Sequence, residues 1–262
     1  MQPSFSGPLA SLAPTALPFA DLINLPVHRL LERIDGLPGA DDLSPLQRSG
    51  LATLMATRGI EPVIRNNIAN RLVGAADADP ALWRTFLAMA QDPAEDEVWR
   101  DYAIQFLALA TPRADDRAAA GAALLRIATD DPGTRGTTAL LHLVRLGREG
   151  ILDRPASLPA LVASRIQDPA TPDPARHVAL ALVGQEGWTE QVPLVRSVLA
   201  AGLDIDATRG ALYTLGMLGD AGDMVVIERY RSATHPAVAA AARAAHDRVV
   251  ARFGSTAAER PQ

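Results

Sequence analysis

Hydrophobic residues recur three and four positions apart along most of the chain, which is the spacing that one buried face of an α-helix produces. Ile64, Ile68 and Leu72 follow this spacing in residues 61–74, and Trp99, Ala103 and Leu107 follow it in residues 96–109. Each segment begins with an acidic residue and carries an arginine four positions later. The pattern predicts a helix in each segment, with one side packed in a core.

The same pattern is found in six segments when they are aligned on this arginine. The aligned column reads Arg65, Arg100, Arg135, Arg176, Arg209 and Ala239, with spacings of 35, 35, 41, 33 and 30 residues. A second helical pattern precedes each segment, at residues 44–59, 79–91, 115–129, 157–166, 190–202 and 222–232. A period of this size is typical of helical repeats, whose hairpins bury their apolar faces by stacking on their neighbours.

Local signals predict where these helices begin and end. Ser44, Asp131 and Asp173 each precede a proline, and a side-chain oxygen followed by proline is a typical helix start. Glycine favours the end of a helix because it adopts the left-handed backbone conformation without strain. The predicted helix ends of this kind are Gly74, Gly147, Gly184 and Gly219.

The segments EPVIR (61–65) and DEVWR (96–100) resemble the second helix of the HEAT-repeat family, which typically reads acid-Pro-x-Val-Arg and continues with alanine and leucine. DPGTR (131–135) and DPAR (173–176) are similar, whereas IDATR (205–209) and HPAVA (235–239) depart further from this pattern. The resemblance extends over residues 44–252. It implies an all-α fold, a right-handed α-solenoid of about six HEAT-like helical hairpins.

The resemblance also implies a structural role for the arginine column, because the HEAT arginine packs over the next unit and pairs with acids or carbonyl groups. Glu61, Asp96 and Asp131 each lie four residues before an arginine, so we expect ion pairs within these helices. The alternative is that five cations along one face bind an anionic partner.

The sequence predicts three regions. Residues 1–25 are proline-rich and carry no charge before Asp21, which favours docking along the outside of the helices, with disorder as the alternative. Residues 26–252 form the solenoid domain, in which 26–35 is a capping helix with Val27, Leu30, Leu31 and Ile34 on one stripe. Residues 253–262 form a C-terminal tail. The interval from Arg135 to Arg176 is 41 residues because the connections at 148–157 and 168–174 are longer than those of the other repeats. These connections are either elongated loops or a binding feature.

Composition narrows the function classes. Aromatic residues make up only 4% of the chain, so its core is built from Ala, Leu and Val, which suits thin helical layers. The absence of cysteine excludes disulfides and thiolate zinc sites. A net charge of −5 argues against a nucleic-acid partner, and no apolar run approaches the roughly 18 residues of a membrane span. The exclusive use of arginine as the basic residue, together with abundant alanine, indicates a GC-rich bacterial genome.

The compartment stays open. The first twenty residues contain four prolines and no basic residue, which is unlike a signal peptide. The chain as written is expected to be cytoplasmic, but a mature periplasmic chain would look the same.

No enzymatic motif is present. The five histidines lack metal-ligand spacing, and nucleophile-elbow, Walker and dinucleotide-binding patterns are absent from the sequence. We expect no catalytic residue, no cofactor and no metal. The alternative is a HEAT-like maturation or modifying enzyme, either bilin-lyase-like or DNA-glycosylase-like. Trp99 beside Asp101 is only a partial match to the aromatic residue and carboxylate that the glycosylase relatives require.

The predicted function is a non-catalytic scaffold that binds a protein or peptide on its concave face, because solenoids commonly act this way. Positions one and five after each arginine are expected to line that face, which is polar in the N-terminal half and small in the C-terminal half. The alternative is an ordinary solvated surface. The predicted binding residues are Asn66, Asn67, Asn70, Asp101, Tyr102, Gln105 and His177.

Overall fold

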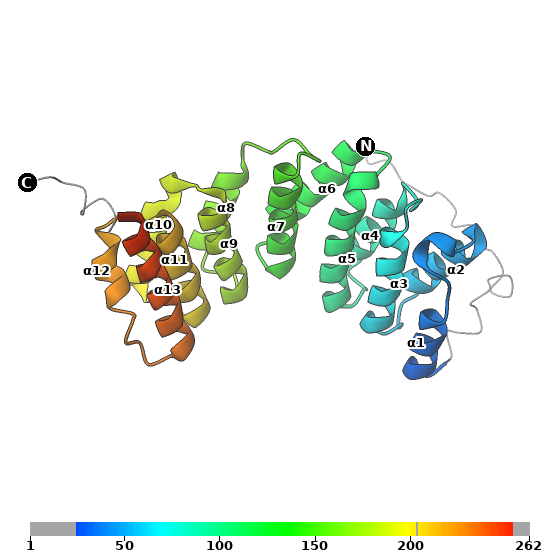
Figure 1. Ribbon diagram of the computed structural model, residues 1–262. Coiled ribbons are helices and arrows are strands. Elements are labelled where there is room, and N and C mark those ends of the chain that lie inside the picture. Colours follow the sequence, from blue (N-terminus) through cyan, green and yellow to red (C-terminus); the bar gives the residue numbers. More distant parts are fainter. Residues whose placement is uncertain (1–24, 203, 254–262) are drawn as a thin grey trace, which may run out of the picture. The chain divides into compact units, whose positions relative to one another are not determined.

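The structure is a computed structural model that describes residues 25–202 and 204–253 (Figure 1). Over these ranges it is all-helical, with thirteen α-helices, three short 3-10 helices and no strand. Residues 1–24 and 254–262 lie outside the described residues, so the expectations for the proline-rich segment and for the C-terminal tail stay predictions.

The chain divides into two compact units, one ending at Asp115 and one beginning at Asp116, which we call the N-terminal and C-terminal units. The N-terminal unit contains α1 (Val27–Asp35), η3 (Ala40–Asp42), α2 (Pro45–Ala56), α3 (Pro62–Gly74), α4 (Leu82–Gln91), α5 (Glu97–Ala110) and η4 (Thr111–Arg113). The C-terminal unit contains α6 (Arg117–Asp130), α7 (Thr134–Arg148), α8 (Leu158–Gln167), α9 (Asp173–Glu186), η5 (Thr189–Gln191), α10 (Val192–Ala201), α11 (Ile205–Leu218), α12 (Asp223–Glu228) and α13 (Pro236–Phe253).

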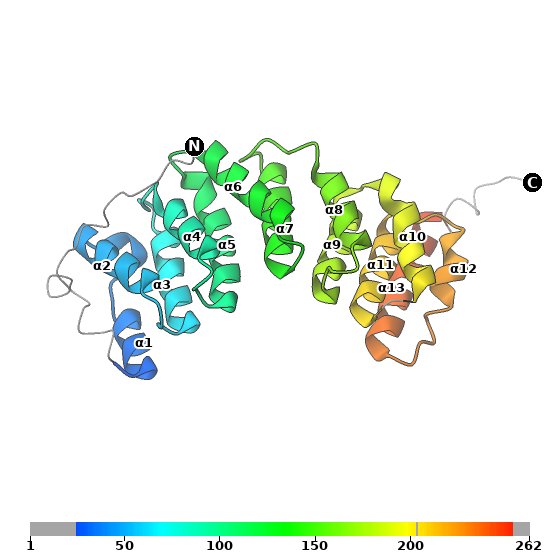
Figure 2. The same cartoon turned by 180° about the vertical axis from the view of Figure 1, so that it is seen from behind.

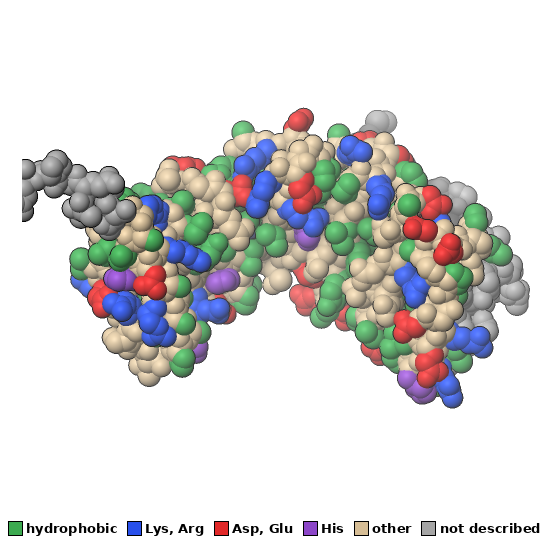
Figure 3. All heavy atoms as spheres, in the orientation of Figure 1, with side chains coloured by type: hydrophobic (Ala, Val, Ile, Leu, Met, Phe, Trp, Pro, Cys, Tyr) green, Lys and Arg blue, Asp and Glu red, His purple; other side chains and the backbone are tan. Residues whose placement is uncertain are grey.

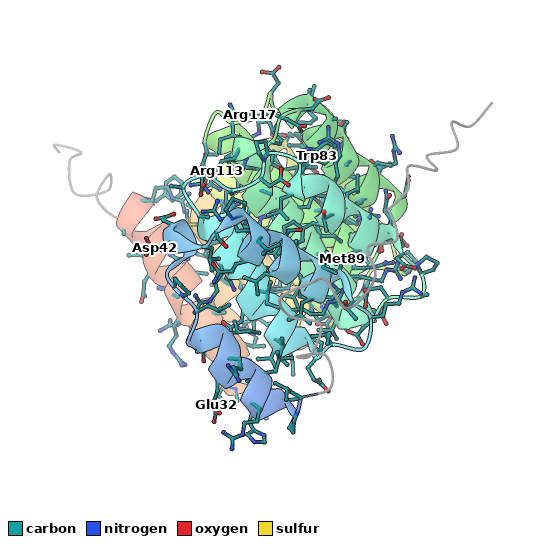
Figure 4. All side chains as sticks on the ribbon, turned by 90° about the vertical axis from the view of Figure 1, so that its right-hand side faces the viewer. Glu32, Asp42, Trp83, Met89, Arg113 and Arg117 are labelled. Atoms are coloured by element: carbon teal, nitrogen blue, oxygen red, sulfur yellow. The ribbon has the colours of Figure 1, made fainter. Side chains whose placement is uncertain are left out.

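In the N-terminal unit, α2 pairs with α3, α4 pairs with α5, and α3 lies against α5. The helix predicted at residues 26–35 is confirmed as α1, which packs on α3 and buries Leu30 and Ile34. Its outer side is polar, with an exposed ion pair between Arg29 and Glu32. Figure 4 shows Glu32 projecting away from the neighbouring helices.

In the C-terminal unit, the hairpins α6–α7, α8–α9, α10–α11 and α12–α13 follow one another, and their second helices α7, α9, α11 and α13 pack in a row. Helices α9, α11 and α13 lie on the side that faces the viewer in Figure 1. Their partners α8 and α10 lie on the opposite side, which Figure 2 shows. The hairpins α8–α9 and α10–α11 therefore each contribute one helix to each side of this unit.

Local chemistry explains several helix starts. Before α2, the Ser44 hydroxyl accepts a hydrogen bond from the Gln47 backbone N–H at 3.3 Å, and the Gln47 side chain accepts one from the Ser44 N–H at 2.8 Å. Pro45 and Pro62 occupy the first positions of α2 and α3, as predicted. The expectation for Asp131 is wrong: α7 begins only at Thr134, and the Asp131 carboxylate accepts from the Gly133 N–H instead.

The glycine predictions are confirmed at two positions and wrong at two. Gly74 is the last residue of α3, and Gly219 follows α11 directly. Helices α7 and α9 instead run past Gly147 and Gly184, to Arg148 and Glu186. An added Cβ at Gly184 would lie 3.3 Å from both the Thr214 Cα and a Tyr213 ring atom, so this glycine permits close packing of α9 on α11.

Candidate binding surface

Arg65, near the start of α3, determines how α3 meets the hairpin α4–α5. Its side chain is 1% exposed, and its Nε donates a hydrogen bond to the Met55 carbonyl at 2.7 Å. Its Nη1 and Nη2 donate to the two carboxylate oxygens of Glu95 at 2.7 and 2.8 Å. A two-point contact of this kind fixes orientation as well as distance. The start of α3 is thereby tied to the connection that leads into α5.

The surroundings of this ion pair reinforce it. The Arg65 guanidinium lies 4.3 Å from the centre of the Trp99 ring, where a cation is attracted to the aromatic face. Hydrogen bonding from Arg65 holds the pKa of the Glu95 carboxyl below its usual value, although burial acts in the opposite direction. Asp96, the next residue, accepts a hydrogen bond from the Trp99 N–H at 2.9 Å and starts α5.

The other arginines of the column also have partners. The prediction of an acid or carbonyl partner is confirmed for all five: Arg65 to Glu95, Arg100 to the Ala90 carbonyl, Arg135 to Asp131, Arg176 to Asp173 and the Asp168 carbonyl, and Arg209 to Asp206. The narrower expectation of pairing with an acid four residues earlier is confirmed only for Arg135. It is wrong for Arg65, which reaches Glu95 of the next hairpin, and for Arg100, which reaches the Ala90 carbonyl of the preceding helix.

The structure places six of the seven predicted binding residues on two packed helices of the N-terminal unit. Asn66, Asn67 and Asn70 lie on α3, and Asp101, Tyr102 and Gln105 lie on α5. We call these six residues the α3–α5 surface. Asn70 is exposed and the other five are half-buried, so none of them belongs to the core.

Hydrogen bonds within each helix orient part of this surface. The Asn70 amide donates to the Asn66 backbone carbonyl at 2.9 Å, and the Gln105 amide donates to the Asp101 carboxylate at 3.0 Å. Each bond uses one of the two N–H groups of the side-chain amide and leaves the carbonyl oxygen as an acceptor. The centres of the Tyr102 and Trp99 rings are 6.3 Å apart, so the tyrosine ring packs against the buried tryptophan.

The sequence analysis missed the apolar residues that extend this surface. Val63 and Val98 occupy equivalent positions one turn before Asn67 and Tyr102, and they are 53% and 58% exposed. Leu109, about one helical turn after Gln105, is also exposed. Val98, Tyr102, Gln105 and Leu109 have the spacing of a single helix face. Extending the aligned columns in both directions from the arginine would have revealed this stripe.

His177, the seventh predicted binding residue, lies on α9 in the C-terminal unit and is half-buried. Its Nδ1 lies 2.8 Å from the Asp206 backbone carbonyl oxygen, at the start of α11. A carbonyl oxygen can only accept, so Nδ1 carries the proton and donates this bond. The geometry therefore assigns His177 a link between neighbouring hairpins.

The described residues contain no cluster of three or more histidine, aspartate or glutamate side chains that could hold a metal ion. No helix among them is both long enough and apolar enough to cross a membrane.

Comparison with known proteins gives no further guidance. No protein-family model matches the chain, and neither the curated proteins nor the solved structures include a match.

Proposed function

We propose that this chain is a HEAT-like α-solenoid of six helical hairpins, α2–α3 to α12–α13, and that it acts as a non-catalytic protein-binding scaffold. In this proposal the α3–α5 surface receives an extended segment of a partner protein. The pairing of each hairpin's two helices and the arginine contacts support the repeat assignment.

The observation that carries the binding proposal is the repetition of one surface pattern on two packed helices. Val63, Asn67 and Asn70 on α3 recur 35 residues later as Val98, Tyr102 and Gln105 on α5. Neighbouring helices pack about 8–10 Å apart, so equivalent side chains on α3 and α5 are spaced to contact successive parts of one extended chain. Side-chain amides can bond its backbone, and the valines and tyrosine supply apolar contact area.

The charges beside this surface support a protein partner over a nucleic acid. Glu61 and Glu97 are exposed at the starts of α3 and α5, and the described N-terminal unit carries thirteen carboxylate side chains against nine arginines. Phosphate backbones are bound by clustered cations, which this surface does not offer. Figure 3 shows acidic side chains over this part of the chain, on the right of the view.

Affinity capture from the source cells tests the proposal. The bait proteins are the wild type, an Asn70→Arg/Gln105→Arg variant, and a Gln91→Arg/Gln185→Arg control that adds the same charge at exposed positions elsewhere. We expect one or more proteins to bind the wild type and the control but not the Asn70/Gln105 variant, and a purified captured protein to bind directly. Identical captures by all three baits, or capture by none, would contradict the proposal.

A further inference from the structure

The α3–α5 surface presents one set of side chains twice. The set on α3 and its equivalents on α5, 35 residues later, are Val63 and Val98, Asn67 and Tyr102, and Asn70 and Gln105. The two helices lie against each other, and packed helices are about 8–10 Å apart. A chain that crosses both helices therefore meets equivalent side chains with a repeat of about 8–10 Å.

A polyproline II chain has the repeat that this surface requires. It has three residues per turn and rises about 3.1 Å per residue, so residues i and i+3 share one face and lie about 9 Å apart. In a β-strand, residues i and i+2 share a face at about 6.4–6.8 Å, which does not match the helix spacing. Because a polyproline II backbone forms no internal hydrogen bonds, its N–H and C=O groups are free to bond the side-chain amides of Asn70 and Gln105.

The chain itself contains a segment with this period. Residues 8–16, which lie outside the described residues, read PLASLAPTA, or the three triplets PLA, SLA and PTA. A polyproline II conformation of this sequence would place Leu9 and Leu12 on the same face, one turn apart. The segment carries no charge, so the exposed carboxylates of Glu61 and Glu97 beside the surface do not repel it.

The segment is attached close to this surface. It leads through the ten residues 17–26 into α1, which packs on α3. Ten extended residues span up to about 33 Å, which is more than the width of two packed helices, about 20 Å. A short tether keeps a binding segment at an effective concentration on the order of mM. Even a weak contact is then formed for much of the time.

We propose that residues 8–16 bind the α3–α5 surface of their own chain, with successive triplets over α3 and α5. The leucines of the triplets pack on Val63, Val98 and Tyr102, and the amides of Asn70 and Gln105 bond the backbone of the segment. This inference rests on the proposed function in that both use the same surface. A partner protein has to displace the segment, which thereby weakens the binding of every partner that competes poorly with it.

Disulfide formation in the full chain tests this proposal, because the sequence contains no cysteine of its own. Ala13→Cys is combined either with Asn70→Cys on the surface or with Gln91→Cys, an exposed position at the end of α4 in the same unit. Glutathione disulfide oxidises both proteins at about 1 µM, far below the effective concentration of a tethered segment, so that thiols of one chain react with each other. The bond to position 70 is expected to form at least about tenfold faster than the bond to position 91.

Leu9→Asp/Leu12→Asp is the matched disruption, because it places charges where the leucines contact apolar side chains. Added to the cysteine pairs, it should slow the bond to position 70 at least about tenfold and leave the bond to position 91 unchanged. Gln2→Asp/Ser4→Asp adds the same charge outside the triplets and should change neither rate. Equal rates at the two positions, no effect of Leu9→Asp/Leu12→Asp, or disulfides formed only between chains would each overturn the proposal.

These rates do not depend on a partner protein, so their outcome is separate from that of the affinity capture. Equal rates together with a capture that depends on Asn70 and Gln105 would overturn the docking of the segment and leave the proposed function intact. A fast bond to position 70 without any captured protein would do the reverse. Where a protein is captured, Leu9→Asp/Leu12→Asp should bind it at least about threefold more tightly than the wild type, because the surface is then always free. Equal affinities would overturn the competition.

Discussion

Arg65 and Glu95 form a two-point ion pair while both side chains are almost fully buried, at 1% and 5% exposure. The two residues are 30 positions apart and belong to different hairpins. Removing one partner would leave the other charge buried without compensation, which is far more costly than losing an ion pair in water. This contact is therefore expected to dominate the stability of the N-terminal unit.

Glu95→Ala should lower the free energy of unfolding by about 3–5 kcal/mol, because Arg65 keeps its charge in a buried site. Arg84→Ala should cost at most about 1 kcal/mol, because its ion pair with Asp115 is half-exposed and well screened. Urea unfolding of both variants measures the difference. Equal losses in the two variants would show that burial adds nothing to the Arg65–Glu95 contact.

The same ion pair should make unfolding sensitive to acid. The native pKa of Glu95 is lowered by Arg65, so its contribution is fully present above the unfolded value of about 4.3. That contribution is lost as the pH falls through the lowered native pKa. Glu95→Gln should flatten the slope of unfolding free energy against pH in the acid range. The same slope in the variant as in the wild type would contradict the assignment.

Gly216 on α11 should not tolerate a methyl group. An added Cβ would lie 2.8 Å from the Ala245 Cα on α13, so the two helices would have to move apart. Gly216→Ala is expected to cost about 1–3 kcal/mol of unfolding free energy, as overpacking generally does. Gly74→Ala is the control, because nothing lies within 4 Å of its added Cβ; it should be neutral or slightly stabilising. A neutral Gly216→Ala would mean that the α11–α13 contact is looser than described.

Helices and core residues could be predicted from the sequence because their signals are local. The apolar spacing identified Ile64, Ile68 and Leu72 as buried, and the Ser44–Pro45 pair marked the start of α2. A helix of this kind depends on residues within a few positions of one another. The sequence alone carries that information.

Contacts between hairpins could not be predicted in this way. Glu61 was the nearest acid to Arg65 along the chain, but Glu95 is nearer in space because α3 lies against α5. Gly184 looked like a helix end, yet it is small because α11 approaches it closely. The contact of His177 with the Asp206 carbonyl of the next hairpin could not be predicted either. Each of these contacts joins segments about 30 residues apart.

For the candidate site, the sequence placed six residues on helices that the structure packs together, but it omitted Val63 and Val98. The predicted residues lie one, two and five positions after the arginine, whereas the exposed valines lie two positions before it. Whether this surface binds a protein stays a prediction.

The most direct test of the proposed scaffold function is a binding titration with the purified captured protein, carried out beside a thermal melt. Tyr102→Ala/Asn70→Ala should weaken binding by about 2 kcal/mol, or about 30-fold, because it removes an aromatic contact and an amide from the α3–α5 surface. The control Gln91→Ala/Gln185→Ala should bind as the wild type does, and the melting temperatures of all three proteins should remain close. Unchanged affinity in the Tyr102/Asn70 variant, together with a large loss of melting temperature, would show that these side chains support the fold and that the binding surface lies elsewhere.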